Sequence, residues 1–306
     1  THFGYIKRIA ADVYRSQRRG GKGLTAMNTR EEDFVEHLFI TSTHNSLMFF
    51  TNTGKVFRLK TYELPEASRT AKGTAIVNLL QLSQGEKIAA VMPVEKFDND
   101  SLYVLMATSN GLIKKTKLSE YANIRKTGIQ AITLKENDEL IDVRLTDGNN
   151  EIIMVTRHGL SIRFKEEEVR AVGRTSMGVK GIELAKDDKV VGMEPIKEDN
   201  GYVLTITENG FGKRTELEEY RCQGRAGKGV LTYKITAKTG NIVGVEIVDD
   251  DDDVMMITDN GIIIRINVND ISILGRNTQG VTLMRTSDGG KLINIAKLPN
   301  EEQEEN

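Results

Sequence analysis

A glycine that recurs at a nearly constant interval is the sequence feature that most constrains this fold. Six such glycines lie 48 to 57 residues apart along the 306-residue chain, and a threonine stands three residues before each of them. The six anchor glycines are Gly4, Gly54, Gly111, Gly159, Gly210 and Gly261. Self-similarity at a period of about 50 residues is typical of propellers and other repeat folds.

The residue pattern within each repeat predicts a group of short strands. Apolar runs such as Leu47–Phe50 and Val203–Ile206 precede the last five anchors and predict buried strands. The Asn-Gly pairs at 110–111, 209–210 and 260–261 predict hairpin turns of type I′, with positive φ at both central residues. A second strand follows the turn, another strand follows a second recurring glycine, and an alternating strand ends the unit.

This order predicts an all-β fold, a six-bladed β-propeller (β-pinwheel) of about four antiparallel strands per blade. A pair of β-sandwiches would explain the strands but not the matched glycines. No segment keeps a helical period over three turns with good caps, which argues against helical repeats. Because the chain begins inside a strand, we expect the two termini to share one blade and close the ring. Residues 1–298 would form the propeller, and residues 299–306 an acidic disordered tail.

The charge of the chain is unevenly distributed. The formal net charge is −2, but nine acids are concentrated in Asp249–Asp253 and Glu301–Glu305. Setting these nine aside leaves the rest of the chain at +7, so most of the chain suits a polyanionic partner. The sequence has no apolar run long enough for a membrane span and no charged leader. Its single cysteine, Cys222, fits a reducing cytosol.

Motifs for catalysis or metal binding are weak. The four histidines fall in different repeats and lack metal-ligand spacing. Gly20–Gly23 and Gly224–Gly229 lack the Gly-Lys-Ser/Thr of a nucleotide-binding loop. Asp249–Asp253 lacks the spaced ligands of a calcium loop, so we expect a solvated run. We therefore expect no catalytic residue, metal or cofactor in this chain.

Basic residues recur at two positions of the repeat. The first position lies four residues after the anchor, on the second strand of the hairpin, and is occupied by Arg8, Arg58, Lys115, Arg163, Arg214 and Arg265. The second position begins an Arg-x-x-x-Gly loop, one residue shorter in the third repeat, and is occupied by Arg19, Arg69, Arg125, Arg174, Arg225 and Arg276. Lys7, Lys114, Lys213 and Lys228 add further charge beside these positions.

These cations have two interpretations. Lysine and arginine on outer strands can protect sheet edges against aggregation. Six matched positions on a disc would instead form a basic ring, which is a track for a polyanion. Because side chains alternate along a strand, we expect only one member of a pair such as Lys114 and Lys115 to face outward.

Duplex DNA is the polyanion that the composition favours. Aromatic residues make up only 6% of the chain and tryptophan is absent, which argues against stacking platforms for single strands. The tyrosines occur at a position that other repeats fill with Leu, Val or Ile, ten residues after the anchor, so we expect them in the core. No helix is predicted that could enter a groove. Contacts to phosphates, with little dependence on sequence, fit best.

The first Arg-x-x-x-Gly loop carries extra glycines and cations. Its sequence Gln17-Arg-Arg-Gly-Gly-Lys-Gly23 resembles the signature box of the DNA gyrase A subunit, and the repeats from Thr1 to about Leu298 resemble the C-terminal DNA-wrapping domain of that family. The resemblance implies a β-pinwheel that bends and wraps duplex DNA around its basic rim and enables ATP-dependent negative supercoiling. It also implies that the box residues Gln17, Arg18, Arg19, Gly20, Gly21, Lys22 and Gly23 bind DNA.

The resemblance further implies that this chain is not itself an enzyme. The catalytic tyrosine, ATP and Mg²⁺ of that family belong to the B subunit or to the rest of the A subunit, which are the implied partners together with DNA. The implied location is the bacterial cytoplasm, in association with the nucleoid. Two alternatives stay open: the DNA-binding domain of a topoisomerase IV-type enzyme, and a propeller that binds other proteins through an exposed apolar patch.

Overall fold

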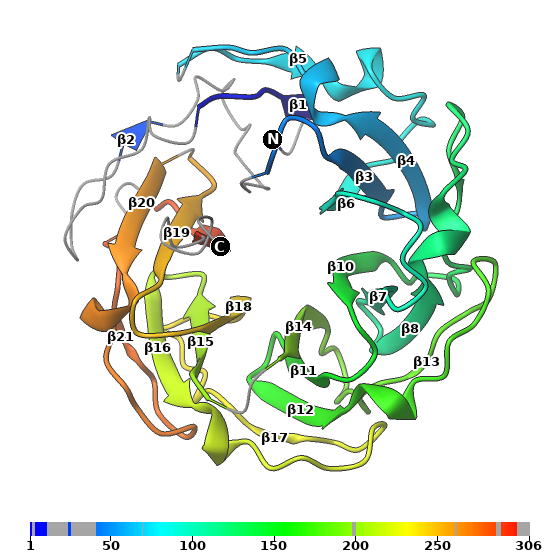
Figure 1. The fold of residues 1–306 in the computed structure, drawn as a ribbon. Coiled ribbons are helices and arrows are strands. Elements are labelled where there is room, and N and C mark those ends of the chain that lie inside the picture. Colours follow the sequence, from blue (N-terminus) through cyan, green and yellow to red (C-terminus); the bar gives the residue numbers. More distant parts are fainter. Residues whose placement is uncertain are drawn as a thin grey trace.

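The strands form a ring of sheets around a common centre (Figure 1). The computed structural model describes residues 1, 4–10, 24–25, 41–68, 70–197, 200–260, 262–285 and 289–298. Within these ranges, five sheets have four antiparallel strands each, and a sixth has two, β1 (Tyr5–Ile6) and β5 (Thr74–Ala75). The fold is therefore an all-β propeller. No helix in these described ranges is long and apolar enough to cross a membrane.

The strands of each blade follow the same order from the centre outward (Figure 1). In one blade this order is β10 (Leu140–Thr146), β7 (Tyr103–Thr108), β8 (Leu112–Lys117) and β13 (Val179–Lys180). The first three strands belong to one repeat, whereas β13 belongs to the next repeat along the chain. Each repeat thus gives its short third strand to the preceding blade, which sequence periodicity does not reveal.

The remaining four-stranded blades repeat this order. From the centre outward they are β6 (Ile88–Val94), β3 (Ser46–Thr51), β4 (Lys55–Lys60) and β9 (Ile129–Gln130); β14 (Val190–Ile196), β11 (Glu151–Thr156), β12 (Leu160–Lys165) and β17 (Val230–Leu231); β18 (Ile242–Val248), β15 (Tyr202–Thr207), β16 (Phe211–Glu216) and β21 (Val281–Thr282); and β22 (Leu292–Leu298), β19 (Asp253–Thr258), β20 (Ile262–Asn267) and β2 (Leu24–Thr25).

The two ends of the chain meet in the last of these blades. Strand β2, near the N-terminus, pairs with β20, and β22, near the C-terminus, is the innermost strand of the same sheet. The prediction that the termini share one blade is confirmed. The first repeat contributes β1 and β2, and its expected last strand at 34–40 lies outside the described residues, as does the acidic tail at 299–306. The described residues consequently form five four-stranded blades rather than six.

Short 3₁₀ turns follow the second strand of each hairpin. They are η2 (Thr61–Glu63), η4 (Leu118–Tyr121), η5 (Glu166–Glu168), η6 (Leu217–Glu219) and η7 (Val268–Asp270), and a further turn, η3 (Ile76–Asn78), follows β5. The residue ten positions after the anchor lies in or just after the first five of these turns and is at most 4% exposed. Tyr121 and Tyr220 are therefore core residues, as predicted.

The core lies between neighbouring sheets. Met48 and Phe50 of β3 belong to the same buried cluster as Val104 and Met106 of β7, and the Tyr121 ring meets Phe50 edge-on with centroids 6.3 Å apart. Fully burying an apolar side chain of this size contributes about 1.5–3 kcal/mol. The described blades built on β3, β7, β11 and β15 are thus packed against a neighbouring sheet on both faces.

The hairpin turns differ from the predicted type I′. Gly111 has φ 83°, but Asn110 is not among the described residues with positive φ. The Thr108 carbonyl accepts the Gly111 N–H at 3.0 Å, and the Thr108 hydroxyl accepts the Leu112 N–H at 3.2 Å. This pattern fits a type I turn followed by a glycine in a G1 bulge. It also explains why a threonine stands three residues before each anchor.

The second recurring glycine lets its loop lie directly on the preceding blade. Gly229 has φ +77°, and a Cβ atom there would lie 2.3 Å from the Ser161 carbonyl oxygen on β12. The position therefore requires both a left-handed backbone and the absence of a side chain.

We expect Gly229→Ala to lower the free energy of unfolding by roughly 3 kcal/mol or more, because backbone strain and a steric clash add together. Gly85→Ala is the matched control, since Gly85 has the same φ of +77° but nothing within 4 Å of its added Cβ. That variant should lose only about 1–2 kcal/mol. Chemical denaturation of both variants measures the difference, and equal losses would contradict the packing role of Gly229.

Candidate nucleic-acid interface

In the first five repeats, the cation four residues after the anchor donates to a backbone carbonyl of the next repeat. Arg163 on β12 donates to the carbonyls of Leu217 and Tyr220, at 3.0 and 3.1 Å, where η6 ends. Arg214 on β16 donates to the Ile271 carbonyl at 2.7 Å, next to η7. A cation at the carbonyl end of a helical turn is favourable because the carbonyl dipoles there point toward it. These side chains thus hold neighbouring blades together.

Three of these six cations are buried. Lys115, Arg163 and Arg214 are 5–7% exposed. Each also meets a carboxylate: Lys115 lies 3.7 Å from Glu166, Arg163 pairs with Glu151, and Arg214 pairs with Asp250. Their charges are neutralised inside the protein, so neither edge protection nor a surface track describes them.

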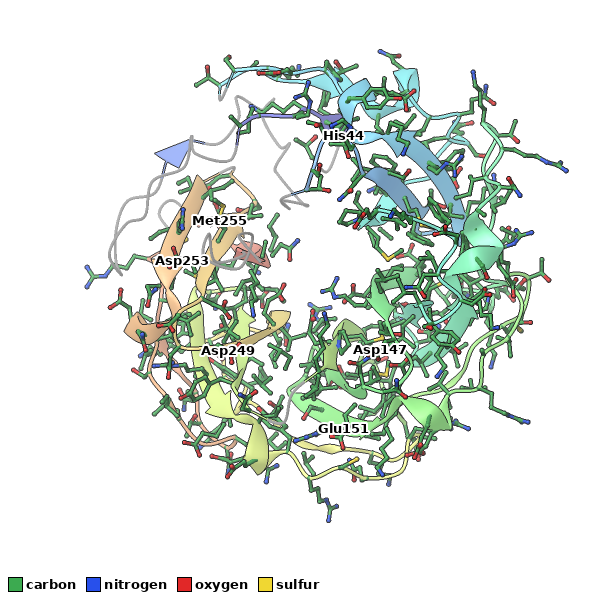
Figure 2. The ribbon with its side chains drawn as sticks, in the orientation of Figure 1. His44, Asp147, Glu151, Asp249, Asp253 and Met255 are labelled. Atoms are coloured by element: carbon green, nitrogen blue, oxygen red, sulfur yellow. The ribbon has the colours of Figure 1, made fainter. Side chains whose placement is uncertain are left out.

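The other three cations at this position are more accessible. Arg8 bonds weakly to the Leu64 carbonyl at 3.4 Å and lies 3.3 Å from Glu66. Arg58 is exposed, although it donates to the Ala122 carbonyl at 2.9 Å. Arg265 donates to Asp253 at 2.7 Å; Figure 2 labels Asp253 on its strand. Of the six, Arg58 is the one described as exposed.

The expectation that one member of each neighbouring pair faces outward is wrong at two pairs. Lys114 and Lys213 are 0% exposed, while their neighbours Lys115 and Arg214 are also buried. The physical reason is that both faces of a blade are covered by adjacent blades, so alternation along the strand exchanges one buried face for another. Lys7, the equivalent residue of the first repeat, donates to the carbonyls of Ser68 and Ala71 at 3.0 and 2.9 Å.

Three arginines of the Arg-x-x-x-Gly loops, Arg174, Arg225 and Arg276, are partly buried and tie successive loops together. Arg225 donates through its guanidinium to the Lys180 carbonyl at 2.8 Å, and its backbone N–H donates to Glu168 at 3.0 Å. Arg174 and Arg276 repeat both contacts with their own neighbours. An acidic residue that directly precedes the buried position ten residues after the anchor therefore caps the Arg-x-x-x-Gly loop of the next repeat. These acids are Glu120, Glu168 and Glu219.

Several cations remain exposed along the outer loops. Among those that make no ion pair with a carboxylate within the described ranges are Arg125, Lys126, Arg170, Lys180, Arg221 and Lys228. They lie on the outermost strands or the loops leading to them, and Figure 2 shows nitrogen-tipped side chains projecting from the outer circumference. Unpaired and solvated, these cations are available to an external anion.

Sequence reasoning selected only Arg125 and Lys228 from this exposed group. Arg170 and Arg221 lie eleven residues after their anchors, where the first repeat has Arg15, so a weaker periodicity could have found them. Lys126 and Lys180 have no equivalent in most repeats. The signature box, Gln17–Gly23, and Arg69 lie outside the described residues.

In the described ranges, the charged cluster between the innermost strands β10 and β14 contains both signs of charge. Arg144 of β10 lies 3.1 Å from Glu194 of β14 and 2.8 Å from Asp142. Burial raises the pKa of Glu194 despite Arg144, and burial together with Glu194 raises the pKa of Glu246 well above its usual value. This mixed cluster joins adjacent blades and is unfavourable for phosphates.

The acidic run Asp249–Asp253 is more structural than predicted. Asp252 is 5% exposed, accepts the Asp249 N–H at 2.7 Å and lies 2.6 Å from Lys297. Asp250 and Asp253 pair with the hairpin arginines of the last two blades. The run is therefore only partly a solvated segment, because the inter-blade cations need carboxylate partners.

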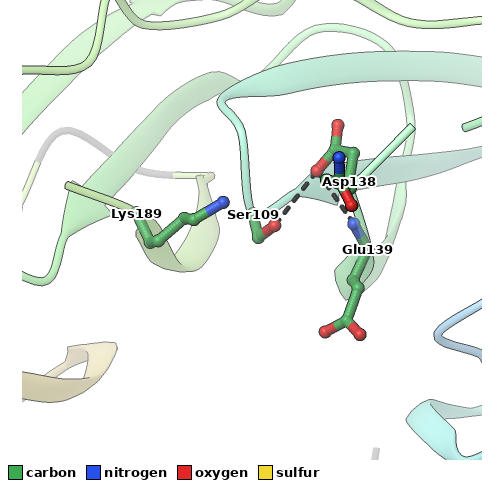
Figure 3. A pocket seen from close by; sticks show the side chains of 5 residues that line it. Ser109, Asp138, Glu139 and Lys189 are labelled. Atoms are coloured by element: carbon green, nitrogen blue, oxygen red, sulfur yellow. Dashed lines mark hydrogen bonds between the residues drawn. The ribbon is translucent and has the colours of Figure 1, made fainter. Parts of the chain in front are cut away.

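A pocket lies beside one hairpin, and its buried carboxylate is already fully hydrogen-bonded. It is lined by Ser109, Asn137, Asp138, Glu139 and Lys189 (Figure 3). Asp138 already accepts hydrogen bonds from Thr108, Ser109, the Asn110 N–H and the Glu139 N–H. Its carboxylate fixes the turn and is not available to a ligand.

The difference between inter-blade and exposed cations can be measured. We expect Arg163→Ala to lower the free energy of unfolding by roughly 3 kcal/mol, because it leaves two carbonyls and Glu151 without their buried partner. Arg125→Ala should change it by about 0.5 kcal/mol or less, since that side chain is exposed. Equal stability of the two variants in urea would mean that Arg163 does not hold the blades together.

Comparison with known proteins agrees with this geometry. The profile of a family described as the DNA gyrase C-terminal domain, beta-propeller, matches residues 1–42, 45–95, 102–147, 150–197, 201–249 and 252–299. The DNA gyrase A subunit of Clostridium acetobutylicum is 54% identical over the whole chain, and that of Salmonella typhimurium is 45% identical over 97% of it. The chain spans 36% and 34% of the length of these two relatives.

Two solved structures have the same fold. The C-terminal domain of DNA gyrase A superposes with a TM-score of 0.88 at 25% identity, covering 97% of both chains. The C-terminal domain of DNA topoisomerase IV superposes with a TM-score of 0.77 at 29% identity, covering 97% of this chain and 90% of the other. With the profile matching nearly the whole chain, this protein belongs to the family of DNA gyrase C-terminal domains.

Proposed function

We propose that this chain is a non-catalytic module that bends and wraps duplex DNA around its outer rim, as part of a bacterial DNA gyrase. The observation that carries the proposal is the set of exposed outer-loop cations without carboxylate partners in the described ranges. Duplex DNA presents a charge every ~1.7 Å of its axis, and its affinity for proteins comes largely from such cations. Family membership supports the same assignment.

The proposed DNA track on the outer rim contains fewer hairpin cations than the basic ring expected from the sequence. The buried cations Lys115, Arg163 and Arg214 hold blades together and are poor candidates for phosphate contact. Contacts from several successive blades are needed, because bending 20–30 base pairs by 40–90° costs on the order of 1–6 kcal/mol. The proposed track consists of Arg58, Arg125, Lys126, Arg170, Lys180, Arg221 and Lys228, together with Arg18, Arg19 and Lys22 of the signature box.

A sixth blade in the first repeat is part of this proposal. Six separate matches to the family profile and the pairing of β1 with β5 support it. The signature box directly precedes β2 in the sequence, and β2 pairs with β20.

The proposed partners are duplex DNA, the gyrase B subunit, and the remainder of the gyrase A subunit. ATP and Mg²⁺ would be used by those other parts, and the proposed location is the bacterial cytoplasm, in association with the nucleoid. The similar topoisomerase IV fold supports a second candidate, the DNA-binding domain of that enzyme. The Gln17–Gly23 box favours gyrase.

The wrapping proposal predicts a change in DNA topology. Ligation of nicked circular DNA in the presence of this chain at low salt should shift the linking number, because wrapped DNA is constrained during closure. An unshifted linking number would contradict wrapping.

Replacing Arg125, Lys126, Arg221 and Lys228 with alanine should weaken duplex binding and make the salt dependence shallower by about 0.9 in log–log slope per lost phosphate contact. The control replaces Lys96 and Lys197, exposed lysines that follow the innermost strands β6 and β14. If both sets of substitutions reduce the slope equally, the outer loops are not the binding surface.

The signature box has its own expected effect. In a reconstituted gyrase, replacing Arg18, Arg19 and Lys22 with alanine should reduce supercoiling while leaving the circular dichroism of the domain unchanged. Full supercoiling by that variant would mean that the box is only a turn.

A further inference from the structure

One position of the repeat alternates around the ring. Three residues after the anchor, the first, third and fifth repeats have Lys7, Lys114 and Lys213, whereas the second, fourth and sixth have Phe57, Ile162 and Ile264. In the described part of the chain, this side chain lies beneath the Arg-x-x-x-Gly loop of the following repeat. The side chain on which each loop packs is therefore alternately a lysine and an apolar residue.

Lys213 is buried beneath the loop of the sixth repeat, and this loop accepts a hydrogen bond from each of its three ammonium hydrogens. Its Nζ donates to the carbonyls of Gly275 and Arg276, both at 2.6 Å, and to the Thr278 hydroxyl at 2.9 Å. The Tyr233 ring lies 5.1 Å away. Lys213 makes no ion pair with a carboxylate in the described ranges, and it lies beneath a loop tip of Asn277, Thr278 and Gln279 that carries no charge.

Lys114, two blades earlier, shares with Lys213 the contact to the carbonyl of the loop arginine. It is 0% exposed, and its Nζ donates to the Ala131 carbonyl at 2.6 Å and to the Arg174 carbonyl. The tip of that loop, Thr175–Met177, also lacks a charge.

The loops that pack on an apolar side chain carry a lysine at the tip instead. Phe57 lies under the third-repeat loop, where a Cβ on Gly128 would be 2.8 Å from its ring. Ile162 lies under the fifth-repeat loop, 3.7 Å from the Cβ position of Gly227. These loops carry the exposed Lys126 and Lys228. The second-repeat loop has a lysine both below, Lys7, and at its tip, Lys72.

The buried lysine also sets the direction of the loop backbone. A trans peptide is planar, with its N–H opposite to its C=O. Because the Arg276 carbonyl points down to Lys213, the N–H of Asn277 points away from it, and the Thr175 N–H likewise points away from Lys114. Amides directed outward over a buried positive charge form a favourable setting for an anion.

We propose that Lys114 and Lys213 are positioning residues for phosphate binding. Each supplies, from beneath its loop, the positive charge that Lys126 and Lys228 supply at the loop tip. The proposal rests on the proposed DNA-binding function. Blades would then hold the duplex in two alternating ways, by an exposed lysine or by outward amides over a buried one.

The two kinds of loop differ in their response to pH. Burial lowers the pKa of Lys213 to about 8, with Glu219 opposing the shift and Arg276 adding to it. The other group against it is the Tyr233 phenol, whose pKa burial raises, so it stays neutral.

Lys114 behaves in the same way. Burial lowers its pKa to about 8, with Glu120 opposing the shift and Arg174 adding to it. The nearby Tyr121 phenol, whose pKa is raised by burial, remains neutral in this range. Exposed lysines titrate near 10.4.

Stability and DNA binding should respond to these lysines in opposite directions. Above pH 8 the unfolded chain holds protons that folded Lys114 and Lys213 have lost, so their contribution to the stability of the fold rises between about pH 8 and 10.5. Their contribution to DNA affinity falls as the buried charge is lost. A general loss of structure would lower both.

Substitution within the repeat provides the test. Lys213→Ile copies Ile162 and Ile264, which occupy the same position in other blades, and Gln279→Lys copies Lys228 before its glycine. We expect Lys213→Ile to weaken binding of a 40-base-pair duplex roughly 3- to 10-fold at fixed salt, the size of one lost phosphate contact. Adding Gln279→Lys should restore the affinity to within about twofold. Lys114→Ile with Met177→Lys is the second pair.

The wild-type pH profile keeps the test independent of folding of the variants. Raising the pH from 7 to 9 should weaken wild-type binding, and more strongly than it weakens the rescued double variants, whose tip lysines keep their charge. A flat wild-type profile, unchanged affinity of Lys213→Ile, or loss without rescue would each overturn the proposal. A wild-type chain that binds no duplex at all would instead overturn the proposed function.

Discussion

The exchange of one short strand between neighbouring repeats is the interaction on which the rest of the structure depends. The carbonyl of each described anchor glycine accepts backbone N–H groups from the segment that reaches it from the next repeat, as Gly159 does from Thr232 at 2.8 Å and Tyr233 at 3.2 Å. The same exchange joins β2 to β20 and closes the ring. Since each apolar cluster lies between two sheets, a repeat can bury its core only when both neighbours are present.

This dependence explains why so many charged residues are internal. Every junction between blades needs donors for the carbonyls at the ends of the 3₁₀ turns, and the hairpin cations supply them. Arg163 and Arg214 are buried with carboxylate partners for this reason, and the acidic residues before the core position cap the next loop. In the described ranges, the cations that remain exposed to an external anion are the smaller set on the outer loops.

The repeat pattern made much of the fold predictable. The anchor glycines, the apolar runs and the core position of Tyr121 and Tyr220 follow from periodicity, because each reports a local requirement of strand, turn or burial. The hairpin turn was predicted as the wrong type, since Asn-Gly favours type I′ only when nothing else constrains the turn. Here the recurring threonine hydroxyl stabilises a G1 bulge instead.

The sequence alone determined the fold class, an all-β propeller, because a recurring pattern of glycines, strands and cations has few folded solutions, and its first loop pointed to the gyrase family. Only the tertiary structure decided which cations are exposed to an external anion. Lys114 and Lys126 are both basic residues of the third repeat, yet one is buried beneath the next loop and the other is exposed at a loop tip. The difference arises from the packing of neighbouring blades, which brings together residues some 60 positions apart, such as Lys114 and Arg174.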